Sequence, residues 1–434
     1  MIEQLKNIVD LAPLAGSAPI SGVRYNPWKI QKEDFERLFE LPLEENPYYP
    51  AGYRVGGEVS GLGKTPLHQG GGCYFQEPSA MSAVTALAVQ DGQRVLDLCA
   101  APGSKATALA TLVPNGVLVA NELHPARAKI LAGNLERMGV GAALVTNCAP
   151  AVLGESFENY FDRILVDSPC SGEGMFRKYP EILETWSAEL VAQCAARSRE
   201  ILEAAAGMLR PGGRMVYSTC TFNEAENEKT VQHFLERHPE FFVVPHGIPE
   251  AQAGRCGLRD AARIFPDARG EGHFVCAMEK KNADFTEKYT CFTPDALPPQ
   301  AADCLAECVL MPPAFYGEKR SMIYKIFGDT VYIVPEDLPS LTKGRMLRAG
   351  VGAAYKKGKV WHPSHHLFTA TPIDRFCRTL TVDDRAAKQF LAGQTLLCDT
   401  RGYTAVLWQG LCLGFGKASG GILKNHYPKG LRTI

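Results

Sequence analysis

Five short apolar runs alternate with longer helical stretches between residues 94 and 219, and this alternation constrains the fold more than any other feature of the chain. The apolar runs are residues 94–98, 116–120, 142–146, 163–166 and 215–218. The last long helix, over 188–209, should end at Arg210-Pro211-Gly212-Gly213. Strands that alternate with helices of this length form βαβ units. The sequence therefore predicts an α/β fold built on a parallel, doubly wound sheet.

Segments of different character flank this alternation on both sides. Residues 1–75 combine short helical stretches with a turn-rich zone, which predicts an α+β extension before the core at 76–282. A linker and a first C-terminal module are expected at 283–370, and a last module at 371–434. Hairpin signals at Gly328-Asp329 and Gln409-Gly410 predict small β-rich modules that are separate from the parallel sheet.

The charge is unevenly divided along the chain. Residues 301–434 hold 18 Lys and Arg against 10 Asp and Glu, whereas the rest of the chain holds 28 against 37. A basic excess of this kind attracts polyanions such as nucleic acid, although ordinary solvated faces would give the same count.

Composition excludes several classes of protein. No apolar run approaches the roughly 18 residues that span a membrane, and the first residues lack the core of a signal peptide. None of the 14 cysteines is spaced Cys-x-x-Cys, which favours reduced thiols over disulfides or a metal site. We therefore expect a cytoplasmic protein that binds neither membrane nor metal.

A loop of mostly small residues follows the first predicted strand and opens a helix. It consists of Cys99, Ala100, Ala101, Pro102, Gly103, Ser104 and Lys105. The loop matches neither a Walker loop nor the glycine pattern of dinucleotide sites. Glu122, at the end of the second strand, is placed to accept hydrogen bonds from ribose hydroxyls. S-adenosylmethionine suits this combination better than NAD; the alternative is a tight turn with a solvent-facing Glu122.

Two cysteines stand just beyond the ends of the fourth and fifth predicted strands. The motif Asp167-Ser168-Pro169-Cys170 follows one strand, and Ser218-Thr219-Cys220-Thr221 follows the other. Parallel strands end at the same edge of a sheet, so both thiols and the acid should lie near the cofactor loop. A single cysteine would more often be structural, but two at one edge favour covalent catalysis.

Methylation of cytosine at carbon 5 has a use for such groups. A thiolate that attacks carbon 6 makes carbon 5 nucleophilic, an acid near N3 stabilises the adduct, and a second thiol assists release. Asp167 would be the acid, either protonated or bridging a proton. Cys220 precedes a helix that we predict to start at Asn223, with Glu226 completing a capping box. The positive end of that helix would enrich the thiolate, which favours Cys220 over Cys170 as nucleophile.

Three motifs carry a resemblance to a known family. They are residues 96–105 (LDLCAAPGSK), 167–174 (DSPCSGEG) and 217–221 (YSTCT), with looser matches at 23–26, 76–80 and 270–274. With these motifs the chain resembles the Sun (Nol/Nop/Sun) family of RNA cytosine-5 methyltransferases. Residues 423–432 resemble the tail module of its RsmF-like branch, which modifies small-subunit ribosomal RNA. The resemblance covers nearly the whole chain.

The resemblance implies a Rossmann-like methyltransferase core, an N-terminal RNA-binding extension and a PUA-like last module. It also implies that Cys220 is the nucleophile, that Cys170 assists product release and that Asp167 stabilises the adduct. S-adenosylmethionine would be held by the loop at 99–105, by Glu122 and Asp167, and by the residue after the third strand.

Two positions depart from the family pattern. Ser168 stands where the family usually has alanine, which adds a hydroxyl group. Asn147 follows the third strand where aspartate is common. An asparagine still accepts a hydrogen bond from the adenine amino group but carries no charge.

The resemblance also implies that the partner is RNA, namely 16S ribosomal RNA or the 30S subunit, bound by a monomer. The target cytosine must be unstacked to reach the thiols. The cations expected to contact RNA are Arg24, Arg177, Lys178, Lys424, Lys429 and Arg432. Further cations that would hold flanking phosphates are Lys343, Arg345, Arg348, Lys356, Lys357 and Lys359.

Other functions stay open at this point. A tRNA cytosine-5 methyltransferase would use the same groups, whereas a DNA enzyme would not need the Thr-Cys motif. An adenine amino-methyltransferase would carry an aromatic residue where Cys170 stands. A non-catalytic RNA-binding factor in ribosome assembly would not need both thiols and Asp167.

Overall fold

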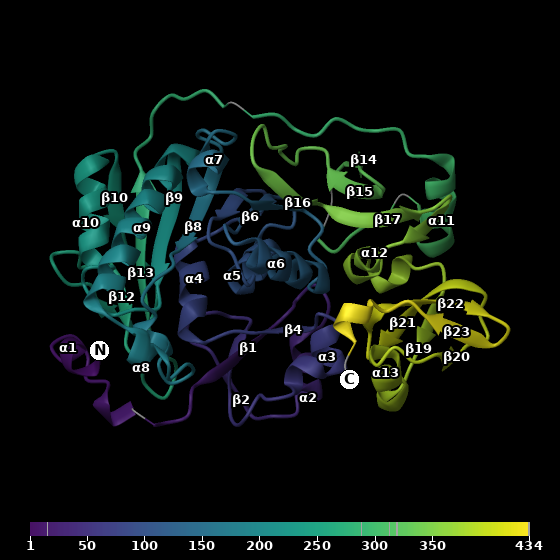
Figure 1. Cartoon of the computed structure of the whole chain (residues 1–434), viewed down its shortest axis with the longest axis horizontal. Helices are drawn as coiled ribbons and strands as arrows, with labels where there is room; N and C mark the ends of the chain where they lie inside the picture. The colour runs from purple at the N-terminus through teal and green to yellow at the C-terminus, as the bar shows by residue number, and fades with distance from the viewer. Residues whose placement is uncertain (15, 288, 312, 318–319, 433–434) are drawn as a thin grey trace.

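A ten-stranded sheet forms the centre of the computed structural model, which describes residues 1–14, 16–287, 289–311, 313–317 and 320–432 (Figure 1). Its parallel strands run in the order β7-β6-β5-β8-β9. They are β5 (Arg94–Asp97), β6 (Val117–Asn121), β7 (Ala143–Asn147), β8 (Phe161–Asp167) and β9 (Leu209–Thr219). The chain order reverses between β5 and β8, so the predicted doubly wound α/β fold is confirmed.

Antiparallel strands extend the sheet beyond β9. The first is β13 (His273–Lys280), which pairs along the end of β9. The others are β10 (Phe241–Val244), β11 (Gln252–Ala253) and β12 (Ala262–Ile264). They place the segment after β9 close to the edge where β8 and β9 end.

Helices cover both faces of the sheet because alternate strand residues point to opposite sides. Val95 packs with side chains of one set of helices, and Leu96 packs with those of another. The first set is α4 (Ser82–Leu87), α5 (Ser104–Leu112) and α6 (Pro125–Arg137). The second set is α7 (Pro150–Gly154), α9 (Ala188–Met208) and α10 (Glu228–Arg237).

The N-terminal sheet has the order β2-β3-β1-β4 and is antiparallel. Its strands are β1 (Ser21–Tyr25), β2 (Leu43–Glu45), β3 (Gly52–Val55) and β4 (Cys73–Phe75). The helices around it are α2 (Lys32–Leu38) and α3 (Pro66–Gln69), whereas α1 (Ile2–Leu5) packs on the core. This mixture agrees with the α+β extension expected before the core.

Two further sheets follow the core, and both predicted hairpins are present. The first contains β14 (Met322–Phe327), β15 (Thr330–Pro335), β17 (Val351–Lys357) and β18 (Val360–Pro363). The last contains β19 (Thr379–Thr381), β20 (Leu396–Leu397), β21 (Gly402–Trp408), β22 (Leu411–Ser419) and β23 (Ile422–Asn425). The helices here are α11 (Pro299–Cys308), α12 (His365–Ala370) and α13 (Asp384–Leu391).

The N-terminal sheet and the last module share one hydrophobic core, although they lie at opposite ends of the described chain. Phe35 and Tyr53 belong to the same buried cluster as Phe390 and Tyr427. The Tyr427 hydroxyl donates to Gln69 Oε1 at 2.8 Å. Figure 1 shows α3 beside α13, in agreement with their contacts. The two modules therefore form one body.

One expectation about the C-terminal region is wrong. The strand β16 (Arg345–Ala349) does not stay in a separate module but pairs antiparallel with β7 and extends the central sheet. The pairing supplies hydrogen-bond partners to what would otherwise be an exposed edge strand. It also lets Ala349 pack with Leu144 in the core.

Within the described residues, no helix is long and apolar enough to cross a membrane. The remaining short helices are α8 (Ile182–Thr185) and the 3-10 turns Ala12–Leu14, Leu62–Lys64, Ser79–Met81, Glu173–Met175, Ile373–Arg375 and Lys429–Leu431.

Candidate active site

The two cysteines singled out in the sequence lie side by side at the carboxyl ends of β8 and β9. Asp167 and Ser218 are in register on these neighbouring strands, so Cys170 and Cys220 follow at one edge. Their sulfur atoms are 3.3 Å apart. The hydrogen bond to Cys220 and burial raise the pKa of Cys170 well above its ordinary value. Cys170 is therefore a protonated thiol that can donate to the Cys220 sulfur.

Asp167 connects the thiols to the loop at 99–105. Its Oδ2 accepts a hydrogen bond from Lys105 Nζ at 2.7 Å, and its Oδ1 accepts one from Ser218 Oγ at 2.8 Å. His273 Nε2 lies 3.6 Å from Oδ1. Burial would raise the pKa of Asp167, but Lys105 and His273 outweigh it and hold that pKa well below its ordinary value. An ionised Asp167 favours the proton-bridging role over the protonated one.

Two buried glutamates fasten the cysteine loops to each other. Glu173, on the loop after Cys170, accepts hydrogen bonds from the backbone N–H of Phe222 at 2.6 Å and of Asn223 at 2.9 Å. Glu226, on the loop after Cys220, accepts one from the backbone N–H of Ser171 at 2.8 Å. Each loop thus supplies the acid that holds the backbone of the other. The 3.3 Å sulfur separation rests on this reciprocal arrangement.

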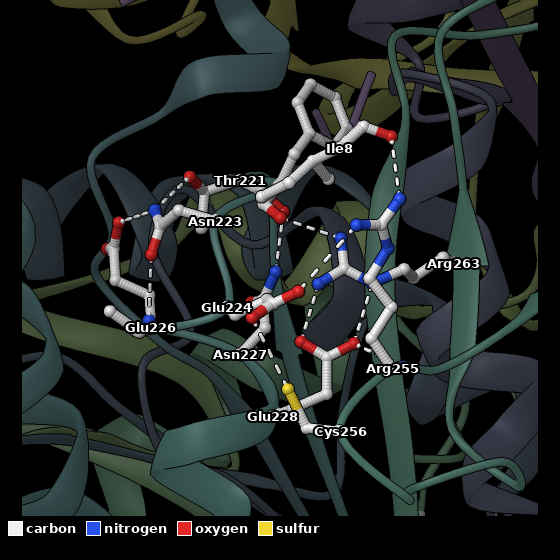
Figure 2. A network of polar contacts seen from close by, with 12 residues as sticks. Ile8, Thr221, Asn223, Glu224, Glu226, Asn227, Glu228, Arg255, Cys256 and Arg263 are labelled. Atoms are coloured by element: carbon white, nitrogen blue, oxygen red, sulfur yellow. Dashed lines mark hydrogen bonds and ion pairs between the residues drawn. The ribbon is translucent and has the colours of Figure 1, made fainter. Parts of the chain in front are cut away.

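The helix predicted to start at Asn223 starts later, because α10 begins at Glu228. Asn223 Oδ1 accepts from the backbone N–H of Glu226 at 2.9 Å, but this bond closes a turn (Figure 2). The Glu226 carboxylate is held by Ser171 and cannot complete the expected capping box. The argument that a helix start at Asn223 enriches the Cys220 thiolate is therefore wrong. The contact that the structure does give the Cys220 sulfur is the Cys170 sulfur at 3.3 Å.

The loop between β5 and α5 has the close approach of backbone expected at a cofactor site. Gly103 has φ of 111°, and a Cβ there would lie 3.2 Å from Leu131 Cδ1. The Ala100 backbone N–H is bonded to Asn121 O at 2.8 Å, which anchors the loop on β6. Burial raises the pKa of Cys99, so this third thiol is not a thiolate.

Asp97 is a candidate residue that the motif reasoning did not select. It ends β5 directly before the loop and is buried, yet neither carboxylate oxygen makes a hydrogen bond to any described residue. Burial and the Asp167 carboxylate raise the pKa of Asp97 to about 8. An acid at the end of an apolar strand, just before a ligand loop, is the sequence signal that would have found it.

Glu122 and Asn147 lie where the second and third parallel strands end. Glu122 is buried, and its Oε1 accepts from the backbone N–H of His124 at 2.9 Å. Asn147 donates its amide hydrogens to the carbonyls of Glu122 and Leu123 at 2.8 and 2.7 Å. This geometry leaves the Asn147 side-chain oxygen to act as an acceptor. Both residues lie at the same carboxyl edge of the sheet as the loop at 99–105.

Two of the cations expected to contact RNA have internal roles instead. Arg24 is buried, and its Nη2 donates to Ser104 O at 2.7 Å and Thr107 Oγ1 at 2.6 Å. Arg177 is buried against Glu271, with Nε 2.6 Å from the carboxylate. Both side chains are buried because their hydrogen-bond and ion-pair partners come from segments far away in the sequence. The expectation of direct RNA contact is therefore wrong for Arg24 and Arg177.

The remaining expected cations divide by exposure. Arg348 is also buried, with Nη1 bonded to Ala132 O at 2.9 Å, and Arg432 is half-buried. The exposed ones are Lys178, Lys343, Arg345, Lys356, Lys357, Lys359, Lys424 and Lys429.

Three more cations, which no motif indicated, line a surface cavity of about 800 Å³ on the last module. They are Arg378, Arg401 and Lys417, and Glu307 joins them from α11. Only folding brings these residues together, because they come from separate strands and turns.

Three family models of related methyltransferase domains match successive parts of the chain. The family model described as 16S rRNA methyltransferase RsmB/F matches residues 84–279. The N-terminal domain of 16S rRNA methyltransferase RsmF matches residues 6–78, and the methyltransferase RsmF PUA domain matches residues 377–433.

A curated relative and two solved structures show the same likeness. The ribosomal RNA small subunit methyltransferase F of Enterobacter sp. (strain 638) is 32% identical over 431 residues, covering 94% of this chain and 89% of its own length. A methyltransferase homologue from Pyrococcus horikoshii is 27% identical, with a TM-score of 0.55, over 62% of this chain and 89% of that one. NSun6 from the same organism, solved with SFG, is 20% identical with a TM-score of 0.57 over 65% and 97% of the chains, which shows likeness in fold.

Proposed function

Because the chain belongs to the RsmB/F family of 16S rRNA methyltransferases, we propose that it methylates carbon 5 of a cytosine in small-subunit ribosomal RNA. The enzyme is an rRNA methyltransferase, and S-adenosylmethionine is its methyl donor. The choice of cytosine and of carbon 5 is our proposal. It is supported by the paired thiols and the ionised Asp167 at one sheet edge.

The residues at the ends of β5, β6 and β7 fit this cofactor. S-adenosylmethionine supplies the methyl group when it is bound, and it brings positive charge and ribose hydroxyls to its site. Asp97, a buried acid without a partner, suits positive charge. The Glu122 carboxylate and the Asn147 side-chain oxygen can accept hydrogen bonds from the hydroxyls and the adenine amino group. The loop from Cys99 to Lys105 would supply the backbone surface.

In the proposed reaction, the Cys220 sulfur forms a bond to carbon 6 of the cytosine. N3 gains the proton that the Cys220 thiol gives up on attack, and the Asp167 carboxylate accepts a hydrogen bond from that N–H. Carbon 5 then has enamine character and can accept the methyl group. Afterwards the carbon 5 hydrogen leaves as a proton to solvent, and the bond from carbon 6 to Cys220 breaks with its electron pair on sulfur. N3 returns its proton to that thiolate. The protonated Cys170, 3.3 Å away, can stabilise the departing thiolate by donating a hydrogen bond to it.

RNA contacts are proposed for the exposed cations rather than for the buried ones. Lys178 follows the Cys170 loop and is exposed near its end. The cavity lined by Arg378, Arg401 and Lys417 offers a concave cationic surface that suits phosphates. These groups would fix the RNA while the target cytosine enters the site.

The observation that carries the proposal is the 3.3 Å separation of the Cys170 and Cys220 sulfurs beside Asp167. It is tested by methyl transfer from labelled S-adenosylmethionine to 16S rRNA, to 30S subunits, to tRNA and to DNA, with bisulfite mapping of the product. Cys220→Ala should abolish turnover, and Cys170→Ala should accumulate a covalent enzyme–RNA adduct on denaturing gels. Turnover by Cys220→Ala would sink the assignment of the nucleophile.

A further inference from the structure

The first fourteen residues pack directly on both cysteine loops. Leu5 and Leu11 are only 2% and 0% exposed, and they share one buried cluster with Phe176 and Phe222. Phe176 lies on the loop after Cys170, and Phe222 lies two residues after Cys220. A segment with a single helical turn thus buries its large apolar side chains against the two loops that carry the thiols.

Polar contacts tie the same segment to the Cys220 loop. Arg255 donates to the backbone carbonyls of Asn7 and Ile8, each at 3.1 Å (Figure 2). The backbone N–H of Arg255 donates to Glu228 Oε1 at 2.9 Å. Glu228 in turn pairs with Arg263, whose Nη1 donates to the carbonyl of Phe222 at 2.6 Å.

The chain beyond the turn at 12–14 makes a second attachment. The Ile20 backbone N–H donates to Glu271 Oε1 at 2.6 Å, and the other oxygen of Glu271 holds Arg177. Arg177 belongs to the Cys170 loop. Residues 1–14 are therefore connected to both cysteine loops by apolar packing and to the Cys220 loop by hydrogen bonds through Glu228. Ile20, just beyond them, connects to the Cys170 loop through Glu271.

Close packing around Phe222 leaves little freedom for the loops to move separately. A Cβ on Gly174 would lie 3.0 Å from Cys220 O and 3.2 Å from the Phe222 ring, and one on Gly272 would lie 2.7 Å from that ring. The phenyl ring is thus held between two glycine-bearing segments. The N-terminal segment closes the remaining side, together with Phe265, whose ring centroid is 5.9 Å from that of Phe222.

We propose that residues 1–14 form an N-terminal clamp that holds Cys220 in its reactive position, with Leu5, Leu11 and Arg255 as positioning residues. The inference rests on the proposed function, because it assumes attack by Cys220. The clamp touches neither the loop at 99–105 nor the cations at the last module in the contacts described above. Its loss should therefore slow formation of the carbon 6 bond and leave cofactor binding in place.

The experiment uses the full-length protein and RNA that carries 5-fluorocytosine at the mapped position, which traps the covalent adduct. The Leu5→Ala/Leu11→Ala and Arg255→Met variants should form the adduct about 10- to 100-fold more slowly, because small misplacements of a reacting group cost rate on this scale. Dissociation constants for S-adenosylmethionine and for RNA should stay within about twofold of the parent protein's. Leu5→Met/Leu11→Met should restore the rate, since it keeps apolar volume.

Matched controls come from the same chain. Leu397→Ala/Leu431→Ala removes two exposed leucines, and Arg259→Met removes an exposed arginine of the loop that carries Arg255. Both controls should form the adduct at the parent rate. The clamp is refuted if the Leu5/Leu11 and Arg255 variants also trap at the parent rate, or if adduct formation, cofactor affinity and melting temperature all fall together. Adduct formation by Cys220→Ala would instead refute the proposed function.

Discussion

The two halves of the sheet edge differ in whether every buried acid has a hydrogen-bond partner. At the ends of β8 and β9, Glu173, Glu226, Glu228 and Glu271 all accept hydrogen bonds from neighbouring loops. At the end of β5, Asp97 is just as buried but meets no donor among the described residues. One half is complete in the protein alone, whereas the other leaves an acid to be satisfied by a ligand.

The contrast separates groups that the protein itself holds in place, the thiols, from a group that a ligand would satisfy, Asp97. The proposed covalent reaction needs the thiols fixed before the RNA arrives, since positioning lowers the barrier. The proposed cofactor site instead keeps a polar group whose burial is costly until a partner enters. The following predictions probe this contrast, from the largest expected effect to the smallest.

Removing an acid from the complete half should cost the most stability. Glu228→Ala leaves Arg263 buried without its partner, and both side chains are at most 2% exposed. Loss of one member of a buried ion pair lowers the free energy of unfolding by about 3–5 kcal/mol. Urea denaturation followed by circular dichroism measures this change.

The control for that variant is Glu236→Ala, an exposed glutamate of the same helix α10. It should change the free energy of unfolding by less than about 0.5 kcal/mol. An equally small change for Glu228→Ala would show that the cysteine loops do not depend on this acid.

Removing Asp97, the acid without a hydrogen-bond partner among the described residues, should weaken cofactor binding instead. Asp97→Asn should weaken S-adenosylmethionine binding about tenfold, or about 1.4 kcal/mol, because an amide, unlike the carboxyl, cannot ionise to pair with positive charge. Isothermal titration calorimetry measures the affinity. Unchanged affinity would mean that Asp97 is not part of the cofactor site.

The same substitution has a predictable pH signature. Asp97 has a raised pKa of about 8 in the folded protein, against about 3.9 for an unfolded aspartate. The folded state therefore binds more protons than the unfolded state between these values. This group's contribution to stability is complete below pH 4 and is lost as the pH rises towards 8. The free energy of unfolding of Asp97→Asn, relative to the parent protein, should rise over that range.

Asp167 ends β8, the strand next to β5, and removing one of the hydrogen bonds that it accepts should have the smallest effect. Ser218→Ala removes one hydrogen bond to Asp167 Oδ1 but leaves the Lys105 ion pair in place. We expect a loss of about 1 kcal/mol in transition-state stabilisation, or about fivefold in the single-turnover rate. Rapid-quench methylation assays with excess enzyme measure it, and a loss above a hundredfold would give Ser218 a direct role.

Much of the core and its motifs could be predicted from the sequence, because local signals specify them. The apolar runs at 94–98, 163–166 and 215–218 predict the strands, and parallel strands must end at a common edge. That rule places Cys170 and Cys220 at one edge. Their 3.3 Å sulfur separation depends as well on the Glu173 and Glu226 contacts, which the rule does not predict.

The rest depends on partners that are remote in the sequence. The pairing of β16 with β7 joins segments about 200 residues apart, and no local pattern announces it. Arg24 and Arg177 look like surface cations until Gln76 and Glu271 are placed beside them. The helix after Cys220 starts later than the capping-box pattern predicts, because the Glu226 carboxylate binds Ser171 on another loop. Tertiary contacts outweigh local propensity in each case.

The core shared by the N-terminal sheet and the last module also determines the order in which parts of the chain can complete their folding during synthesis. Phe35 and Tyr53 leave the ribosome well before Phe390 and Tyr427, which pack with them in the folded protein. Until then the N-terminal sheet exposes an apolar surface, which is the kind of intermediate that chaperones bind. Chains that stop before residue 387 should therefore be cleared by proteolysis, even though their methyltransferase core is complete.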